Sequence, residues 1–247
     1  SGGRKPILLT LGSSKYVLGI DIGQTNTVIA MANLKGQKQY ERKVPTSRNK
    51  AVAHIVRQIT ELVNESLTKS GVKSENLLSV GISTAGLVDS NRGYIHFSPD
   101  FNWKDVPLKS LMEEAIGFPV VVDNCTRALA LGEIRYGGAK DAQNLFFVNV
   151  GHGIGSALMI NGSIYCKNSE FGHIRATSKA IRCDCGKEGC LEAVSSGHAI
   201  ERRAAELYPD DAGWMTAEEV AALARDGDER ALEIFRDAGR YLGRAIA

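Results

Sequence analysis

Three cysteines gathered within eight residues are the feature that most restricts how this chain can fold: Cys183, Cys185 and Cys190. With His173 from a preceding loop they would complete a tetrahedral Zn²⁺ shell that has no open position, which is typical of a structural site. A lone histidine is more often a hydrogen-bonded structural group, and only the loop position of His173 favours ligation. Reduced thiols that merely pack are the alternative, but the charged residues between the cysteines make this loop too polar for a core. The sequence therefore predicts a structural zinc ion held by these four side chains.

The cysteine count and the charge indicate a cytoplasmic globular protein. Five cysteines is an odd number, and their clustering suits a metal better than the disulfide framework of a secreted protein. The formal net charge is +2 with both signs interspersed, so no electrostatic footprint for nucleic acid is present. The longest apolar run, Leu145–Val150, is too short to span a bilayer, and the N-terminus has no signal segment. We therefore expect no membrane contact, and DNA contact only through a part outside this chain.

The first half of the chain has the pattern of an α/β lobe. Apolar runs and alternation predict strands at Tyr16–Ile22, Val28–Asn33, Gln39–Val44, Leu77–Ser83, Gly93–Phe97 and Pro119–Val122. Helical spacing predicts helices at Ala51–Lys69, Pro107–Ala115 and Thr126–Tyr136. We expect a domain junction near Asn124, with an N-terminal α/β lobe at residues 16–124 and a C-terminal α/β lobe at residues 125–247.

The second half repeats the opening hairpin and then becomes helical. Strands are predicted at Leu145–Val150 and Ser156–Ile160, followed by the hairpin signal Asn161-Gly162. Helices are predicted at Gly197–Leu207, at Thr216–Asp226 with Thr216 and Glu219 as a capping box, and from Asp228 onward. The last helix reaches Ala247 without a stop signal, so we expect this lobe to be truncated at its C-terminus.

Two glycine turns join strand pairs at corresponding places in the two halves. The first contains Asp21, Gly23 and Thr25, and the second contains Gly153 and Gly155. Such turns let backbone N–H groups approach phosphates while a carboxylate holds Mg²⁺ through water. An ordinary hairpin turn explains either one alone better than phosphate binding does. Their occurrence at the starts of two similar halves favours a duplicated nucleotide-binding architecture.

Six motifs of this chain resemble, in order, those of the ROK family, which includes repressors and sugar kinases. They are Asp21-Ile22-Gly23-Gln24-Thr25, Gly81-Ile82-Ser83-Thr84-Ala85-Gly86, Val122-Asp123-Asn124, Gly153-Ile154-Gly155, Glu170-Phe171-Gly172-His173 and the segment from Cys183 to Glu192. The cysteine loop paired with Glu-x-Gly-His is specific to that family, whereas the glycine turns are shared with the wider actin-like ATPase superfamily. The chain is therefore identified as a member of the ROK family, of its NagC/XylR regulator type.

The resemblance implies a two-lobed actin-like ATPase (ribonuclease H-like) fold with a central cleft and a structural zinc loop. It further implies that sugar hydroxyls are bound by polar side chains and one glycine: Gly86, Asp100, Asn124, Glu170, His173 and Glu192. Asp100 stands where the family usually has Asn. Taken individually, Asp100 and Glu192 would be read as solvated surface charges. In His173 one ring nitrogen would face zinc and the other the sugar, so that the metal orients the binding loop.

One departure from the family pattern decides between the family's two activities. ROK kinases carry Asn-Asp where this chain has Asn124-Cys125, and that Asp accepts the proton of the attacking sugar hydroxyl. A thiol, with an ordinary pKa near 8.5, is a poor substitute for a fixed carboxylate. Gln24 stands at a position usually held by Gly, and His152 at one where the kinases have Thr. We therefore expect no catalytic residue, with Cys125 at the position of the kinase base.

The N-terminal segment and one loop also bear on the resemblance. Residues 1–15 resemble the linker with which ROK regulators leave a winged-helix DNA-binding head that is not in this chain. Between Tyr165 and Glu170 the chain is shorter than the family pattern, so the conformation of this loop does not carry over from the resemblance.

The sequence leaves three hypotheses for the function. The first is the sugar-sensing, effector-binding and dimerisation module of a transcriptional regulator. It would bind a sugar or sugar phosphate and would form a homodimer or higher homo-oligomer. The second is an ATP-dependent hexose kinase of the glucokinase kind that uses another base in place of Cys125. The third is a zinc-braced interaction module without a small ligand. ATP consumption with a panel of hexoses, and calorimetry with sugars, would distinguish them.

Overall fold

The computed structural model describes residues 12–165, 170–209 and 215–247. The chain divides into two compact units, Ser1–Gly138 and Ala139–Ala247. The expected junction near Asn124 lies one helix earlier than this division. The reason is that helix α3 (Cys125–Tyr136) packs on two strands of the first unit, β4 (Leu77–Thr84) and β8 (Val120–Asn124). The expected linker falls largely, and the shortened 166–169 loop entirely, outside the described residues.

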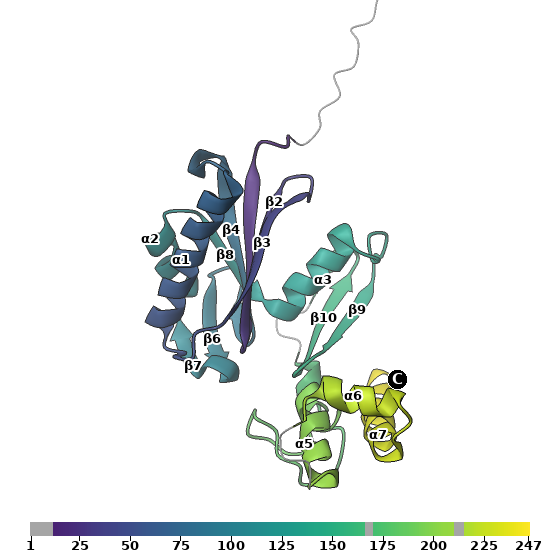
Figure 1. Ribbon diagram of the computed structural model, residues 1–247. Coiled ribbons are helices and arrows are strands. Elements are labelled where there is room, and N and C mark those ends of the chain that lie inside the picture. The colour runs from purple at the N-terminus through teal and green to yellow at the C-terminus, as the bar shows by residue number, and fades with distance from the viewer. Residues whose placement is uncertain (1–11, 166–169, 210–214) are drawn as a thin grey trace, which may run out of the picture. The chain divides into compact units, whose positions relative to one another are not determined.

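A mixed five-stranded sheet forms the centre of the first unit (Figure 1). Its other three strands are β1 (Tyr16–Ile22), β2 (Asn26–Asn33) and β3 (Lys38–Pro45), and the order is β3-β2-β1-β4-β8. The β1–β2 and β2–β3 pairs are antiparallel, whereas β4 runs parallel to both β1 and β8. The carboxyl ends of β1, β4 and β8 therefore meet at one edge of the sheet, where a ligand site is expected in such folds.

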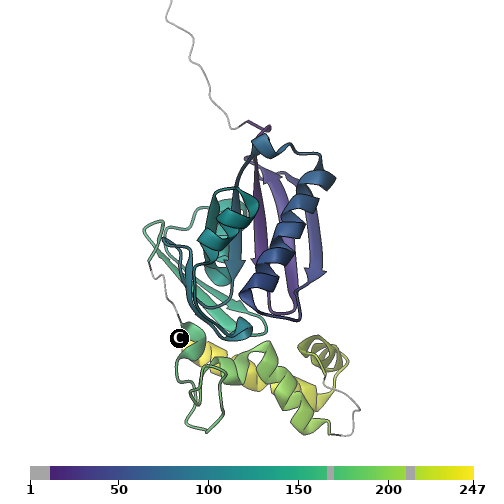
Figure 2. The same cartoon turned by 90° about the vertical axis from the view of Figure 1, so that its left-hand side faces the viewer.

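Two helices cover one face of this sheet, as Figures 1 and 2 both show. They are α1 (Val52–Ser70) and α2 (Leu108–Ile116). Alternate residues of the strands point towards them, and the apolar stripe of α1 that contains Ile55, Ile59 and Val63 is fully buried against these residues. This packing is the main hydrophobic core of the unit.

A small three-stranded sheet follows β4 in the same unit. It consists of β5 (Leu87–Asp89), β6 (Tyr94–Ser98) and β7 (Trp103–Val106). The sequence predicts only the middle strand, because β5 and β7 are too short to show a period. Between β6 and β7, the short 3-10 helix η2 (Pro99–Phe101) carries the exposed Asp100 and the buried Phe101.

The second unit begins with an antiparallel sheet and continues into helices. Its strands are β9 (Leu145–Val150), β10 (Ile154–Ile160) and β11 (Ser163–Ile164), in the order β11-β10-β9. Its helices are α4 (Glu192–Ser195), α5 (Gly197–Leu207), α6 (Ala217–Arg225) and α7 (Glu229–Ile246). The last three pack around a small core that includes Ala204, Val220 and Ile234. The predicted capping box of Thr216 and Glu219 is confirmed at the start of α6.

The described long strands and helices agree closely with the predicted ones, whereas the short strand β11 and the 3-10 helix η3 (Phe171–His173) of the second unit were not predicted. Strand β10 begins two residues earlier than predicted, and α4 was not predicted. Among the residues that the structure describes, no helix is both long and apolar enough to cross a membrane.

Candidate functional site

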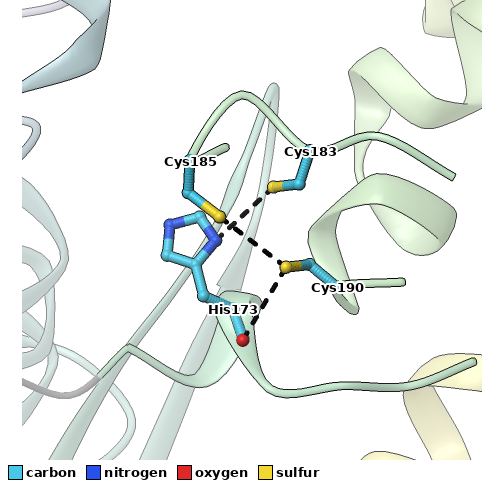
Figure 3. A group of neighbouring side chains, drawn as sticks. All are labelled: His173, Cys183, Cys185 and Cys190. Atoms are coloured by element: carbon cyan, nitrogen blue, oxygen red, sulfur yellow. Dashed lines mark hydrogen bonds between the residues drawn. The ribbon is translucent and has the colours of Figure 1, made fainter. Parts of the chain in front are cut away.

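The three clustered cysteines and His173 converge in the second unit (Figure 3). The sulfur atoms of Cys185 and Cys190 are 3.7 Å apart, and the sulfur of Cys183 is 3.6 Å from Nδ1 of His173. One ligand atom from each of the four residues lies within 4.8 Å of all the others. Ligands around a tetrahedral ion with metal–sulfur bonds of about 2.3 Å are separated by roughly 3.8 Å. The four residues therefore fit a single metal ion.

Backbone hydrogen bonds shape the loop that carries the cysteines. The N–H of Cys183 donates to the carbonyl of Lys187 at 2.9 Å, and the N–H of Gly186 donates back to the carbonyl of Cys183 at 2.9 Å. The returning segment pairs with an earlier loop through a bridge between Arg175 and Cys190. The sulfur atoms are thus held together by the backbone as well as by any ion.

Burial changes the acidity of the thiols. It raises the pKa of Cys183 to about 12, and it raises the pKa of Cys190 as well. The cause is the loss of hydration, which disfavours the thiolate more than the thiol. A bound cation reverses this preference, because a coordinating thiol is deprotonated outright. Metal binding at this cluster must therefore release protons.

The carboxylate of Glu192 connects the cluster to the second glycine turn. Glu192 is the first residue of α4, and its Oε2 accepts a hydrogen bond from the N–H of Ile154 at 2.8 Å. Its other oxygen, Oε1, lies 3.8 Å from Nδ1 of His173 and 3.8 Å from the sulfur of Cys183. A single side chain thus contacts both the cysteine cluster with His173 and the turn at the start of β10.

The two ring nitrogens of His173 face different groups. Nδ1 faces the cysteine sulfurs, whereas Nε2 lies 3.8 Å from Oε2 of Glu170, whose side chain is largely exposed. The structure therefore brings together the three sugar-binding candidates of this unit, His173, Glu170 and Glu192. Their role towards a sugar stays a prediction.

In the second glycine turn the N–H of Gly151 donates to the carbonyl of Gly153 at 2.9 Å. Gly153 lies directly against the carboxylate of Glu192, and Gly155 is already part of β10. The first turn is similar, because the N–H of Gly23 donates to the carbonyl of Asn26 at 3.0 Å. Both turns are thus hairpin turns, and their part in phosphate binding is not tested by this geometry.

In the first unit, strand register aligns three polar residues at the carboxyl edge of the sheet. Asp21 pairs with Ser83, and Ser83 pairs with Asp123. The hydroxyl of Ser83 donates to Oδ1 of Asp21 at 2.6 Å. The buried Arg127 donates through Nε to Asp123 at 2.7 Å and through Nη2 to the carbonyl of Val88 at 2.9 Å. The charge of Asp123 is therefore paired with Arg127, whereas Asp21 presents an exposed carboxylate.

Sequence reasoning missed the pair of Asp123 and Arg127. Helix spacing does not mark this pair, because Asp123 lies in strand β8 and only Arg127 lies in helix α3.

Asn124 uses most of its hydrogen-bonding capacity within the protein. It is the N-cap of α3, and its Oδ1 accepts from the N–H groups of Thr126 at 2.9 Å and Arg127 at 3.3 Å. Its Nδ2 donates to the carbonyl of Gly86 at 3.0 Å. Only one amide hydrogen then remains for a ligand. The structure therefore joins two predicted sugar-binding residues, Asn124 and Gly86, by a direct hydrogen bond.

Gly86 occupies a position that no other residue would fill without strain. Its φ is +119°, and a Cβ there would lie 2.4 Å from the carbonyl oxygen of Phe97. We expect Gly86→Ala to lower the free energy of unfolding by about 2 kcal/mol, since the backbone must shift. Urea unfolding followed by circular dichroism measures this. Gly71→Ala, at a left-handed helix end with open space around the added carbon, is the matched control. An equal loss in both variants would mean that the φ angle and not the contact with Phe97 matters.

Cys125 is the first residue of α3 and lies near two acidic residues. Burial raises the pKa of its thiol, and the negative charge of Asp21 and, more weakly, that of Asp100 raise it further. Hydrogen bonds with Thr126 oppose these effects only in part, so the pKa stays raised and the thiol is protonated at neutral pH.

Sequence reasoning missed Lys50, which lies beside the first glycine turn and near Asp100. Its ammonium donates to the carbonyl of Gln24 in the first glycine turn and lies 5.3 Å from the ring centroid of Phe101. Burial lowers its pKa, and the nearby charge of Asp100 partly opposes the shift. The indole N–H of Trp103 fixes the backbone by donating to the carbonyl of Lys50 at 2.7 Å. No sequence motif marks this lysine, since it is brought to the turn only by the fold.

Comparison with known proteins finds relatives along almost the entire chain. The profile of the ROK family matches residues 17–247. The glucokinase of Halalkalibacterium halodurans is 31% identical over 251 residues, covering 95% of this chain and 76% of the glucokinase.

Solved structures of both a regulator and a kinase resemble the chain. A ROK family transcriptional regulator, described as a homologue of the E. coli Mlc protein, has a TM-score of 0.82 and 28% identity. That match covers 94% of this chain and 61% of the regulator, so this chain spans less than two thirds of it. A ROK family glucokinase from Streptomyces griseus, in complex with glucose and AMPPNP, has a TM-score of 0.81 and 30% identity, covering 94% of this chain and 78% of the glucokinase. These neighbours agree with the mixed α/β, kinase-like fold that the sequence predicts.

Proposed function

We propose, since this chain belongs to the ROK family, that it is the sugar-sensing, effector-binding and dimerisation domain of a transcriptional regulator and has no kinase activity. The observation that carries this proposal is the thiol of Cys125 at the start of α3. Kinases of the family, as the resemblance implies, have an Asp there that accepts a proton. A half-buried thiol whose pKa is raised stays protonated at neutral pH and so does not accept one. General-base catalysis of this kind contributes about 10²–10⁴-fold to a rate.

The proposed sugar ligands are Gly86, Asp100 and Asn124 in the first unit, and Glu170, His173 and Glu192 in the second. Carboxylate, amide and imidazole groups suit adjacent hydroxyls, because they both accept and donate hydrogen bonds. The effector would be a sugar or a sugar phosphate. It regulates the protein only to the extent that it binds one conformation more tightly than another.

We propose zinc as the ion of the cysteine cluster. A set of three cysteines and one histidine is a structural zinc set, and the separations of its atoms support a closed tetrahedral shell. When bound, the ion would supply a rigid anchor for His173. The ring nitrogen Nε2 would then be left to face Glu170 and the sugar.

DNA binding would belong to a winged-helix domain of the longer regulator, and we propose that the whole protein acts as a homodimer or higher homo-oligomer. The similarity to a solved ROK family transcriptional regulator supports the regulator role, whereas the winged-helix domain and the oligomeric state follow from the family resemblance.

An ATP-dependent hexose kinase is the second candidate. The similarity to glucokinases favours it, since the glucokinase of Halalkalibacterium halodurans shares 31% of aligned residues with the chain. Another group, such as the exposed Asp21 or Asp100, would then have to replace the missing base.

Calorimetry and an ATP-consumption assay with one panel of hexoses and hexose phosphates distinguish the candidates. We expect heat of binding for at least one sugar and no ATP turnover above background. Turnover with any hexose would establish the kinase instead. No heat and no turnover with the whole panel would favour an interaction module without a small ligand.

Glu192→Gln tests the sugar site directly. We expect it to weaken sugar binding by at least about tenfold, because hydrogen bonds to a charged group are worth about 1.5–3 kcal/mol. The amide oxygen of glutamine still accepts from Ile154, so the glycine turn is preserved. Glu188→Gln makes the same change at an exposed position of the cysteine loop and serves as the matched control. Equal affinity for sugar in both variants would remove Glu192 from the site.

A further inference from the structure

A second group of side chains with metal-ligand chemistry occurs in the second unit, besides the cysteine cluster. It consists of His152 in the glycine turn, and of His198 and Glu201 on α5. One ligand atom from each residue lies within 4.8 Å of the other two. The proposed sugar-sensing function does not use these residues.

Backbone contacts hold the turn against the first residues of α5. The N–H of Gly197 donates to the carbonyl of Gly151 at 2.7 Å, and the N–H of His198 donates to the carbonyl of His152 at 3.2 Å. A Cβ on Gly197 would lie 2.8 Å from the carbonyl oxygen of Gly151, so this close approach depends on the glycine. The two histidines are therefore adjacent because their own backbones are hydrogen-bonded.

The side chains are arranged as ligands of one ion would be. The ring centroids of His152 and His198 are 5.1 Å apart and the rings are inclined by 25°. With metal–nitrogen bonds of about 2.1 Å, two imidazoles on one ion have centroids separated by roughly 5 Å. Nδ1 of His198 lies 3.8 Å from Oε2 of Glu201, three residues later on the same helix face.

A hydrogen bond from the backbone of α6 orients the carboxylate of Glu201. Oε1 of Glu201 accepts from the N–H of Ala217, the first residue of α6, at 3.2 Å. Only 17% of the Glu201 side chain is exposed. Partners of this kind fix the direction of a metal-binding carboxylate.

We infer that His152, His198 and Glu201 bind a divalent first-row transition-metal ion such as Zn²⁺. Two imidazoles and one carboxylate suit such an ion better than Mg²⁺ or Ca²⁺, which prefer oxygen ligands. Three protein ligands leave a coordination position open, unlike the closed shell at the cysteine cluster. The ion fastens the glycine turn to α5, and so the conformation of the turn responds to the supply of the metal.

The test counts metal ions on the tag-free protein after dialysis against micromolar ZnCl₂. We expect the wild type to hold one zinc ion per chain more than His152→Ala and His198→Ala do. In calorimetric titration with ZnCl₂ we expect Glu201→Gln to weaken this extra site by at least about tenfold, as the loss of a metal-binding carboxylate should. His96→Ala, which removes an exposed histidine of the first unit, should match the wild type.

Equal zinc content in the wild type and His152→Ala would overturn the inference, and so would an unchanged titration in Glu201→Gln. His152 is exposed, so its replacement should not impair folding, and circular dichroism checks this. The readout is a difference between variants, so it does not depend on the ion at the cysteine cluster or on sugar binding.

Discussion

Replacing Cys183 by serine is expected to release the metal from the cluster and to lower the free energy of unfolding by more than about 4 kcal/mol. Loss of a structural metal belongs to the few causes of so large an effect. Serine keeps the shape of the side chain but is a poor ligand for zinc, and Cys183 is buried beside Glu192 and His173. The melting temperature should fall by about 10 °C in a protein of this size.

Metal analysis and thermal unfolding, made on the same samples, measure both parts of this prediction. Cys190→Ser should behave in the same way, because it removes another of the four ligands. Both variants should also bind sugar more weakly, since His173 and Glu192 lose their fixed neighbour. Cys125→Ser, a cysteine of the first unit, is the control and should keep its metal. Finding no zinc in the purified wild type would remove the basis of the prediction.

Replacing Cys125 by aspartate is expected not to create a good kinase. Although the variant regains a carboxylate at this position, we expect its rate of hexose phosphorylation to stay at least about 100-fold below that of a ROK glucokinase measured in parallel, a deficit as large as a missing general base would cause. The new carboxylate would join Asp21 and Asp100, whose charges already act on this position. In addition, the backbone of Gln24 in the first glycine turn is engaged by the ammonium of Lys50.

ATP consumption and direct detection of the phosphorylated sugar should be measured together for this variant. Cys125→Asn is the control, because asparagine has nearly the shape of aspartate without its charge. A loss of stability seen in both variants would come from the change of shape and not from the carboxylate. A rate within tenfold of the glucokinase would show that Cys125 alone prevents catalysis. It would also show that the ATP side of the site is intact.

The strands and helices were predictable because their signals are local. Buried and more exposed residues alternate along β1 and β2, and the buried residues Ile55, Ile59 and Val63 of α1 recur at helical spacing. Both patterns arise because one face of each element is buried. The grouping of the three cysteines was also predictable, because a short loop keeps residues of nearby sequence close in space, and His173 joins them as expected. The ring nitrogen of His173 that faces the sulfurs could not be predicted, since it depends on the rotation of the ring against Glu170.

Contacts between distant segments were the part that the sequence did not reveal. Lys50 contacts Gln24 because the segment after β3 folds back to the first glycine turn, and no sequence spacing predicts this contact. The pairing of His152 with His198 likewise depends on a backbone contact between a turn and a helix that are far apart in sequence. The packing of α3 on β4 and β8, which places this helix in the first unit, is likewise not visible in its own sequence.

The amide of Asn124 has a consequence for protein engineering. It closes the first turn of α3 and at the same time ties that turn to the carbonyl of Gly86. A mutant library built to test the proposed sugar site would therefore lose folding stability wherever it replaces Asn124. Such a library should keep Asn124 fixed and diversify Asp100, which is exposed on a short helix.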